Sequence, residues 1–515
     1  MRSAVGRHLC WFTVFAACAL PPAETQSPPN IVLIYVDDVG YGDLSCYGAT
    51  AVQTPNIDRL AREGLLFTDA YCTSATCTPS RYSLLTGEYA FRRPRARVLR
   101  GNAPLLLDPD RATMADILGR AGYRTAVIGK WHLGLGAGDL DWNGPIRPGP
   151  LELGFDECFL LPATGDRVPC VYVEGHAVVG LDPSDPIEVS YGKRIGTEPN
   201  GKERPDLLKM KWHHGHNNSI VNGVSRIGYM TGGEEARWVD EDMADVFTEE
   251  ALEFLDRHRD DSFFLFFSTH DVHVPRLPHP RFHGATDMGP RGDALVQMDE
   301  GVGQLLDKLD ELGIADNTLV LFTSDNGPVV NDGYVDESVE RLGDHRPAGG
   351  LRGGKYSAFE AGTRVPFLVR WPARIEPGRS GALQSQVDLC ATFAALAGEP
   401  LAAGEAPDSF VQLESLLGES PTGREYVILQ AGTLALRIGD WKFIRPGKGR
   451  KFNRNVRIEL GNDPEPQLYN LRDDPGETVN LAGQMPDRTA AMAAQLEAWV
   501  AAGQTRSPVD PAQGR

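Results

Sequence analysis

The chain has 515 residues, of which 41% are hydrophobic and 23% are charged, and its formal net charge at pH 7 is −19. This length suits one large α/β domain with a smaller second domain, and the composition is typical of a globular protein. The negative charge argues against a nucleic acid as partner. Beyond the N-terminus no apolar run is long enough to predict a transmembrane span.

The first residues predict an export signal. Arg2 and Arg7 precede an apolar run over residues 9–20, and Ala17-Cys18-Ala19 offers an A-x-A cleavage site. We therefore interpret residues 1–19 as a signal peptide. Its removal takes away two arginines and leaves the mature chain still more acidic.

The segment that follows, residues 20–28, is a short Pro-rich linker. A chain with such a leader is expected to be exported, and so to be periplasmic or secreted. Cys18 offers a lipoprotein anchor as a less favoured alternative, because Phe15 fits that pattern poorly.

Six cysteines lie beyond the leader: Cys46, Cys72, Cys77, Cys158, Cys170 and Cys390. Six in a chain of this length do not form a disulfide scaffold. If Cys77 has a chemical role, five remain, so at least one further thiol is free. A disulfide between Cys158 and Cys170 is the pairing that we suggest.

Apolar segments of strand length alternate with amphipathic helical patterns along most of the chain. The strand-like segments are residues 30–38, 123–129, 262–270, 317–327 and 365–371. The helical patterns cover residues 236–258 and 293–313. This alternation predicts an α/β domain over residues 29–422, with a large mixed, mostly parallel sheet sandwiched by helices.

Two regions depart from that pattern. Residues 139–235 are rich in Pro, Gly and His and have little periodicity, so we expect long loops that shape a substrate pocket. From about residue 423, short strand-like runs alternate with Gly and Asp-Asp-Pro-Gly turns and end in a helical pattern. Residues 423–515 are therefore predicted to form a smaller C-terminal α+β domain with a short antiparallel sheet.

Polar clusters follow four of the predicted strands. They are Asp37-Asp38, Lys130-Trp131-His132, His270-Asp271-Val272-His273 and Ser324-Asp325-Asn326-Gly327. In an open α/β sheet, functional groups gather beyond the carboxyl ends of the strands. Asp and Asn are common in turns, but four clusters at one sheet edge are hard to explain as turns alone.

Four of these residues form an all-oxygen ligand set. They are Asp37, Asp38, Asp325 and Asn326. Hard oxygen ligands favour Ca²⁺ or Mg²⁺ over zinc, which prefers histidine and cysteine. The sequence therefore predicts a calcium site, with magnesium as the alternative.

Lysines and histidines nearby are candidates for handling an anion. Lys130 and His132 are two residues apart, so in an extended segment both side chains point to the same side, and such a pair suits an anionic group or a leaving oxygen. Lys355 lies in a glycine-flanked loop, where an exposed lysine is the plainer interpretation. Of the later histidines, His273 is the better candidate for chemistry and His270 for a structural role.

Cys77 lies in the segment CTPSR, just before a run with the character of a helix start. Thr78 and Ser80 are plausible caps of that helix. A helix N-terminus favours anions and would lower the pKa of a thiol. These features suggest a nucleophile that faces an anionic substrate beside a divalent metal.

The residues Cys77-Thr78-Pro79-Ser80-Arg81, followed by Leu85-Thr86-Gly87, match the C-x-P-x-R…L-T-G signature of type I sulfatases. The chain resembles this family over nearly its whole mature length. The resemblance implies the alkaline phosphatase superfamily fold. It also implies that a formylglycine-generating enzyme oxidises Cys77 to formylglycine, the nucleophile of the family.

The resemblance also implies roles for individual residues. Asp37, Asp38, Asp325 and Asn326, with the modified Cys77, fall on the family's ligands for one Ca²⁺. The catalytic set is Cys77, Arg81, Lys130, His132, His273 and Lys355. In that set the lysines neutralise charge on the sulfuryl oxygens, Arg81 steadies the aldehyde hydrate, and His132 or His273 is the acid for the departing alcohol.

The expected activity is sulfuric ester hydrolysis, and the expected substrate is a sulfated carbohydrate. The alternative is a phosphodiesterase or phosphonate monoester hydrolase on the same fold. A two-zinc phosphatase would need more histidine and aspartate ligands than these positions supply. A catalytically silent glycan-binding protein is a third reading, but no metal ligand and no signature arginine is lost.

Basic segments stand out in so acidic a chain. RRPRARVLR, residues 92–100, follows the signature helix, and Arg92 and Arg93 are candidates to attract a polysulfated substrate. An equally weighted alternative is that they pair with acids and hold a loop. His270 and Arg352 are further substrate-binding candidates, whereas the basic run at 448–457 is interpreted as a solvated loop.

Overall fold

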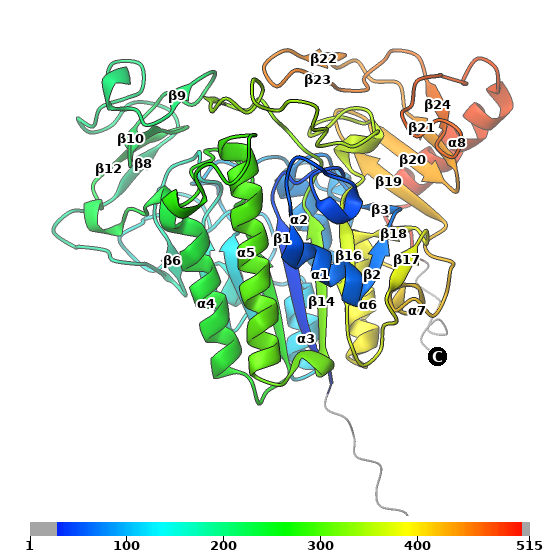
Figure 1. Cartoon of the computed structure of the whole chain (residues 1–515), viewed down its shortest axis with the longest axis horizontal. Helices are drawn as coiled ribbons and strands as arrows, with labels where there is room; N and C mark the ends of the chain where they lie inside the picture. The colour runs from blue at the N-terminus through cyan, green and yellow to red at the C-terminus, as the bar shows by residue number, and fades with distance from the viewer. Residues whose placement is uncertain (1–27, 507–515) are drawn as a thin grey trace, which may run out of the picture.

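The computed structural model describes residues 28–506 and is built on a ten-stranded sheet (Figure 1). The spatial order of its strands is β17–β2–β16–β14–β1–β13–β4–β5–β6–β7. Their bounds are β1 (Asn30–Val36), β2 (Leu65–Phe67), β4 (Arg124–Lys130), β5 (Glu157–Leu161), β6 (Val173–Glu174), β7 (Ala177–Val178), β13 (Phe263–Ser268), β14 (Thr318–Ser324), β16 (Phe367–Arg370) and β17 (Gly378–Ser380). The predicted signal peptide, Cys18 and most of the linker lie outside the described residues.

The five strands at the centre of the sheet, β14, β1, β13, β4 and β5, are parallel to one another. The strands β16, β6 and β7 add antiparallel pairs toward the edges. Every residue of β1 and β14 is buried, as expected for strands covered on both faces. The predicted mixed, mostly parallel sheet is therefore confirmed.

Eight α-helices are found in the described part of the chain. They are α1 (Pro55–Glu63), α2 (Cys77–Thr86), α3 (Met114–Arg120), α4 (Met243–Arg257), α5 (Pro290–Glu311), α6 (Leu389–Leu396), α7 (Leu413–Leu416) and α8 (Pro486–Ala501). In Figure 1, α1, α4 and α5 cover the near face of the sheet, while α2, α3 and α6 lie behind it. No described helix has the length and apolar character needed to span a bilayer.

The predicted helices differ from the observed ones mainly at their starts. The pattern at 236–258 becomes α4 only from Met243, because two short 3₁₀ turns precede it. The helix predicted over 293–313 begins earlier, at Pro290, where proline is well placed in a first turn that needs no donor.

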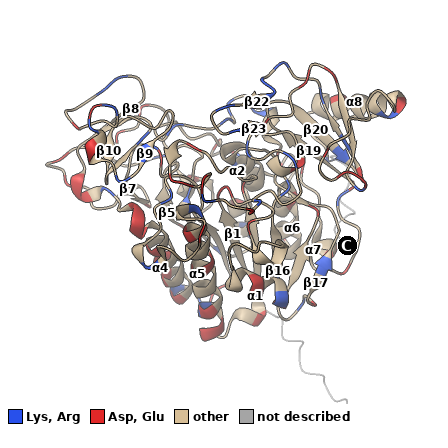
Figure 2. Cartoon of the chain, turned by 45° about the horizontal axis from the view of Figure 1, so that its top comes forward, with Lys and Arg blue, Asp and Glu red and all other residues tan. Residues whose placement is uncertain are grey.

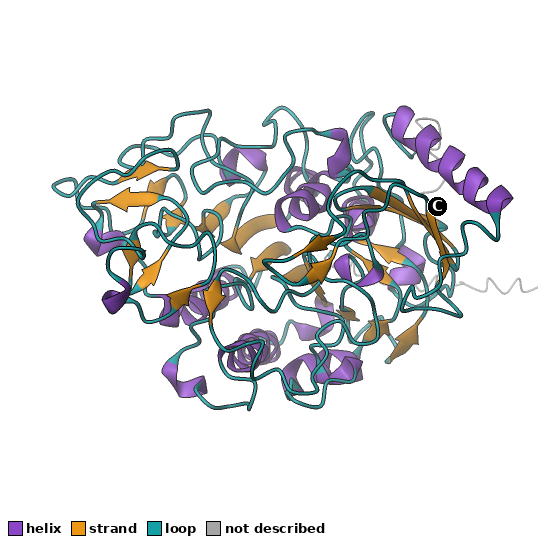
Figure 3. Ribbon diagram, turned by 90° about the horizontal axis from the view of Figure 1, so that it is seen from above, coloured by secondary structure: helices purple, strands orange, loops and turns teal. Residues whose placement is uncertain are grey.

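The region predicted as long loops contributes three strands to the ten-stranded sheet, β5, β6 and β7, so that prediction was wrong for residues 157–161, 173–174 and 177–178. The longest of them, β5, has only five residues and the other two have two each, so they give little periodic signal. The other strands of the region form small pairs above the sheet, and Figure 3 shows them among long loops. Their bounds, with the partner β15, are β8 (Glu188–Ser190), β9 (Lys211–Trp212), β10 (Ile220–Val221), β11 (Val224–Ser225), β12 (Tyr229–Thr231) and β15 (Tyr334–Val335).

The C-terminal part of the chain forms a four-stranded antiparallel sheet with α8 packed on it, as predicted. The strands are β19 (Tyr426–Gln430), β20 (Leu434–Ile438), β21 (Trp441–Ile444) and β24 (Gln467–Asn470). Two further short pairs complete the fold: β3 (Ala70–Tyr71) with β18 (Gln384–Ser385), and β22 (Phe452–Asn453) with β23 (Ile458–Glu459).

Backbone hydrogen bonds join this C-terminal sheet to the segment that leads into α2. The amide of Ala75 donates to the carbonyl of Gln430 at 2.8 Å, and the amide of Gln430 donates to the carbonyl of Thr73 at 2.8 Å. The last residue of β19 is therefore paired with the approach to Cys77.

A buried ion network makes a second connection between the two parts. The Lys442 ammonium on β21 lies 3.0 Å from a carboxylate oxygen of Glu360 and 3.0 Å from one of Glu477, and all three side chains are fully buried. Glu477 also accepts the Glu360 amide at 2.6 Å. Burial and the neighbouring Glu360 charge raise the pKa of Glu477 to about 7, against the opposing charge of Lys442.

Arg92 ties the loop after α2 to the C-terminal region. Its guanidinium donates two 2.8 Å hydrogen bonds to Asp408, whose side chain is fully buried, and also reaches the carbonyls of Trp499 and Val500 at the end of α8. Of the two interpretations of residue 92, the structure therefore supports the loop-holding one, and the guanidinium is not free for a substrate.

We expect Arg92→Ala to destabilise the protein by about 3–5 kcal/mol, because it leaves the buried Asp408 carboxylate without its cation. Arg93→Ala is the matched control. Arg93 is 49% exposed and its partner Glu88 keeps a second cation, Arg111, at 3.0 Å, so the expected cost is about 0–1 kcal/mol. Chemical denaturation measures both, and equal losses would contradict the assignment.

Candidate active site

The carboxyl ends of β1, β4, β13 and β14 bring the four predicted polar clusters together. These strands are neighbours in the sheet, so the residues that follow them meet at one edge. Backbone bonds fix the meeting point: the Asp37 amide donates to the carbonyl of Asp271 at 3.0 Å, and the Asp325 amide donates to the carbonyl of Val36 at 3.0 Å.

Cys77 is the first residue of α2, a helix in which every residue is buried. The predicted caps were wrong, because Thr76 occupies the N-cap position and makes no side-chain capping bond. Thr78 instead donates from its hydroxyl to the carbonyl of His132 at 2.9 Å, and Ser80 donates to the carbonyl of Ser74 at 3.1 Å. The Thr78 hydroxyl holds the helix start against the strand end that carries His132, and the Ser80 hydroxyl holds it against the segment that leads into the helix.

The Cys77 side chain is only 2% exposed. Burial raises the pKa of its thiol above the ordinary value, although Lys130 and Lys355 oppose this shift. The expectation that the helix N-terminus would lower this pKa was therefore wrong, since desolvation outweighs the nearby positive charges. A buried thiol in this state is a poor nucleophile.

Three cations neutralise the carboxylates of the cluster. Arg81 donates from Nε and Nη2 to one oxygen of Asp325, at 3.0 and 2.9 Å. Lys130 donates to Asp37 and lies 3.4 Å from Asp325. Lys355 lies 2.7 Å from Asp38 and is buried, so its interpretation as an exposed loop lysine was wrong.

The pKa values of two of these carboxylates shift in opposite directions. Burial and the Asp325 charge raise the pKa of Asp37 well above its usual range, and Lys130 opposes them only in part. Burial also acts to raise the pKa of Asp325, but Lys130, Arg81 and Lys355 together hold it below the usual value. Asp325 is thus the carboxylate on which the positive charges converge.

The residues present fit a hard divalent cation. Ligand oxygens of Asp37, Asp38 and Asp325 lie within 4.8 Å of one another. Asp37 Oδ1 and Asn326 Oδ1 are buried and accept no hydrogen bond from any described residue, while the amide nitrogen of Asn326 donates to Asp38 at 2.7 Å. Buried oxygens are rarely left without a partner, and oxygen donors of this kind suit Ca²⁺.

Two other groupings near the cluster include histidine nitrogens. They are Asp37 with His270 and His273, and Asp38 with His273 and Asp332. Lys130 and Lys355 already contact the aspartates of these groups. A further divalent cation there would be opposed by an ammonium group, which argues against a two-zinc arrangement.

The hydrogen bonds of the two histidines assign them different tautomers. His132 Nε2 lies 3.1 Å from the carbonyl of Leu99, so it carries the proton, and Nδ1 is a buried acceptor without a described partner. His273 Nδ1 lies 2.8 Å from the carbonyl of Val274, so Nδ1 carries the proton, and the unprotonated Nε2 lies 3.9 Å from a carboxylate oxygen of Asp38. Burial is the main cause that holds both pKa values well below the usual range, with Lys130 contributing at His132 and Lys355 at His273.

The long loops contribute a second polar group that sequence reasoning missed. His216 Nε2 lies 2.9 Å from Asp166, and Arg167 contacts the same carboxylate at 2.6 Å. The charge of Arg167 acts on both Cys77 and His132, so this group faces the cluster. The histidine-rich run at 213–216 was the one available signal, since a lone Gly-Asp-Arg in a loop has none.

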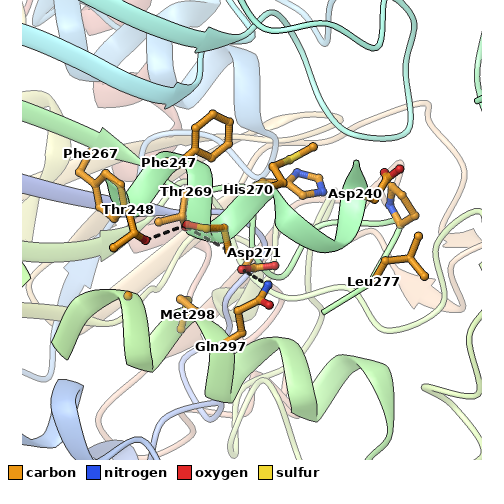
Figure 4. A pocket seen from close by; sticks show the side chains of 14 residues that line it. Asp240, Phe247, Thr248, Phe267, Thr269, His270, Asp271, Leu277, Gln297 and Met298 are labelled. Atoms are coloured by element: carbon orange, nitrogen blue, oxygen red, sulfur yellow. Dashed lines mark hydrogen bonds between the residues drawn. The ribbon is translucent and has the colours of Figure 1, made fainter. Parts of the chain in front are cut away.

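A small cavity lies behind the cluster, between α4, α5 and the end of β13 (Figure 4). Its volume of about 20 Å³ has room for one water molecule but not for a sugar. His270 lines it together with Asp271, which accepts a 3.1 Å hydrogen bond from Gln297. Burial lowers the pKa of His270 to about 4.

Arg352, the remaining substrate-binding candidate, is engaged with the C-terminal region. Its guanidinium donates to Glu459 at 2.6 Å and to the carbonyl of Glu477 at 2.6 Å, and it stacks 3.9 Å from the centre of the Phe359 ring. These contacts hold the loop that carries Lys355.

All six cysteines of the described chain are free, so the suggested disulfide between Cys158 and Cys170 was wrong. The thiols of Cys158 and Cys170 have separate partners. Cys158 Sγ donates to the carbonyl of Gly175 at 3.4 Å, and Cys170 Sγ lies 3.8 Å from the carbonyl of Arg167. They lie on different segments of the same apolar core.

The sequence of the chain matches known proteins over most of its length. The sulfatase family profile matches residues 29–399. An N-acetylgalactosamine-6-O-sulfatase of Bacteroides thetaiotaomicron is 52% identical over 477 residues, covering 92% of this chain and 93% of that protein. Human arylsulfatase A is 33% identical, with 94% and 92% covered.

Solved structures agree with these sequence matches. A 6S-sulfatase structure described under glycosaminoglycan metabolism by Bacteroides thetaiotaomicron superposes with a TM-score of 0.92 at 52% identity, covering 93% of this chain and 100% of that one. A phosphonate monoester hydrolase of Agrobacterium radiobacter shares the fold at a TM-score of 0.57 and 18% identity, covering 92% and 96%.

The burial of the thiols and the absence of a disulfide among the described residues can be tested in protein that retains cysteine at position 77. We expect a thiol reagent such as Ellman's reagent at pH 8 to react slowly with the native protein, because five of the six cysteines are buried and the pKa of Cys77 is raised. In urea without reductant, all six thiols of the leader-free chain should react. Four reactive thiols would reveal a disulfide and contradict the structure.

Proposed function

The chain belongs to the sulfatase family, and we propose that it removes the 6-O-sulfate from N-acetylgalactosamine residues of sulfated glycans. Hydrolysis of sulfuric esters follows from the family, and a carbohydrate substrate is supported by the relative that shares 52% of its residues. One observation of the site carries the chemistry: three buried cations, Arg81, Lys130 and Lys355, contact the carboxylates of Asp325, Asp37 and Asp38.

The proposed nucleophile is a formylglycine at position 77, made by a formylglycine-generating enzyme. The hydrated aldehyde would supply a hydroxyl for attack on sulfur, and a Ca²⁺ ion held in the site would polarise the sulfate oxygens. The raised pKa of the Cys77 thiol supports this proposal, because an unmodified cysteine at this position is a weak nucleophile.

The chain's own residues then have separable tasks. Asp37, Asp38, Asp325 and Asn326 would hold the cation through their carboxylate and amide oxygens. Lys130 and Lys355 are placed to neutralise charge that grows on the sulfuryl oxygens. Arg81, through its two bonds to Asp325, holds that carboxylate beside the start of α2.

Two histidines divide the proton transfers in this proposal. The free Nδ1 of His132 is suited to accept a proton from the attacking hydroxyl. In the protonated ring, Nε2 of His273 is suited to deliver its proton to the departing sugar oxygen. A bound sulfate ester carries a negative charge, which favours the protonated form of His273 despite its lowered pKa.

The group formed by Asp166, Arg167 and His216 is our candidate for recognising the sugar. A carboxylate, a guanidinium and an imidazole together can pair with the hydroxyls of one ring. The phosphodiesterase or phosphonate hydrolase alternative has no specific observation in its favour. The buried lysines beside Asp37 and Asp38 suit the single charge of a sulfate ester.

We further propose that the protein is exported, because the apolar N-terminal segment with its A-x-A site reads as a leader. Formylglycine chemistry then operates outside the cytoplasm on glycans too large to be imported intact.

The activity is tested with N-acetylgalactosamine 6-sulfate and the matched 6-phosphate. The protein should release sulfate and leave the phosphate ester intact. The peptide that contains residue 77 should have the mass of an aldehyde, with oxygen in place of sulfur and two hydrogens fewer. Cys77→Ala should lower kcat about 10³-fold or more, whereas the buried control Cys390→Ala keeps it. Full activity with an intact Cys77 thiol would refute the proposed nucleophile.

The cation is tested through stability, without any turnover. Calcium should raise the melting temperature of the wild type above its value in EDTA, because a ligand that binds only the native state stabilises it. Asn326→Ala should remove most of this increase. Asn317→Ala, at the opposite end of β14, should retain it. Stoichiometric zinc without calcium in active protein would overturn the assignment.

A further inference from the structure

A strongly basic hairpin lies in the C-terminal part of the chain. We call residues 448–459 the basic hairpin, which contains the antiparallel pair β22–β23. Its five basic side chains are all exposed to solvent, and they are Lys448, Arg450, Lys451, Arg454 and Arg457. Figure 2 shows basic segments on the ribbon around β22 and β23.

Most of this positive charge is not neutralised by the protein. Lys451 pairs with Asp463. Within residues 28–506, no carboxylate lies within 4 Å of the other four basic side chains of the hairpin, and the acid of β23, Glu459, pairs with Arg352 instead. In a chain whose formal net charge is −19, a free cluster of this kind is a local exception.

The hairpin is fixed against the rim of the active site. Val456 and Ile458 are buried in one small apolar cluster with Val329, and Tyr356 packs against it. Val329 follows the metal-site residue Asn326 closely in the chain, and Tyr356 is the residue after Lys355.

Hydrogen bonds strengthen that attachment on both sides. The side-chain amide of Asn331 donates to the carbonyl of Asn455 at 2.5 Å, and the amide of Ala358 donates to the carbonyl of Leu460 at 3.0 Å. A loop that served only for solubility would need no such attachment. The free charges are therefore held beside the mouth of the site.

The same hairpin exposes an aromatic ring. Phe452, on β22, is 44% exposed, which is unusual for phenylalanine in a folded protein. A flat aromatic face packs well on the C–H face of a sugar ring. Free cations and an exposed ring together match the two properties of a sulfated or carboxylated glycan: repeated negative charge and apolar ring faces.

We propose that the basic hairpin binds the part of an anionic glycan chain that extends beyond the sugar undergoing desulfation. The solvated-loop interpretation of residues 448–457 is replaced by this one. The inference rests on the proposed function for the identity of the glycan, and it adds that an oligosaccharide is bound more tightly than the corresponding monosaccharide. The positive charge of the basic hairpin also offsets the repulsion between an acidic protein and a polyanion. This repulsion acts over about 8 Å at physiological salt.

The test compares a chondroitin 6-sulfate hexasaccharide with the monosaccharide N-acetylgalactosamine 6-sulfate. Changing Lys448, Arg450 and Arg454 together to Gln should raise KM for the hexasaccharide about tenfold and leave kcat unchanged. KM for the monosaccharide should stay within about twofold. Phe452→Ala should raise KM for the hexasaccharide alone, and its effect should not depend on salt.

The matched control is the triple change of Arg62, Arg124 and Arg259 to Gln. It removes the same charge from the sheet edge opposite the site, since Arg124 begins β4 whereas Lys130 ends it. This control should leave both KM values unchanged. If the hairpin and control variants act alike, or if the hairpin variant affects both substrates equally, the proposal is wrong.

Binding separates the inference from the proposed function. In the Cys77→Ala protein, calorimetric titration with the hexasaccharide should show binding that the hairpin variant weakens about tenfold. Hairpin-dependent binding without desulfation of either substrate would sustain the inference and refute the proposed activity. Desulfation of the monosaccharide with hexasaccharide binding that ignores the hairpin would do the reverse.

Discussion

The site depends on keeping a set of charges balanced away from water. Asp37, Asp38 and Asp325 are fully buried beside the fully buried Arg81 and Lys130, and an isolated charge at such a depth would be very costly. These groups reach the cluster from the ends of β1, β4 and β14 and from α2, and Lys355 adds its loop through Asp38, so these segments are held in one arrangement. Removal of any one partner leaves a buried charge without compensation and destabilises the protein. The same contacts therefore position the site and stabilise the fold.

Much of this could be predicted from the sequence, and for a physical reason. The central strands are buried on both faces, so they appear as continuous apolar runs, and the polar residues that end them must meet at one edge of a parallel sheet. Asp37, Lys130, His273 and Asp325 were found in this way, and the structure does bring them together. Cys77 was found from the local signature, which depends on a short contiguous sequence and needs no knowledge of the fold.

The remainder could not be predicted, because it depends on contacts between segments distant in sequence. Asp166 and His216 lie in loops without periodicity, and only the folded chain places them together. The thiol pKa of Cys77 follows from burial that a helix-start pattern does not reveal. Arg92 looked like part of a basic surface, and its partner Asp408 is far along the chain. In each case the sequence shows the residue but does not reveal which distant residue it contacts.

The burial of Cys77 has a consequence for how the protein is made. Its side chain is 2% exposed within a wholly buried helix, so the proposed conversion to formylglycine would need the chain before it has folded. The segment leading to Cys77 takes backbone partners from Gln430, which the ribosome adds much later. The site can therefore be completed only after residue 430 has been made, and this delay would provide a time window for the proposed conversion. Any change that speeds early collapse around α2 would shorten that window and lower the yield of converted protein.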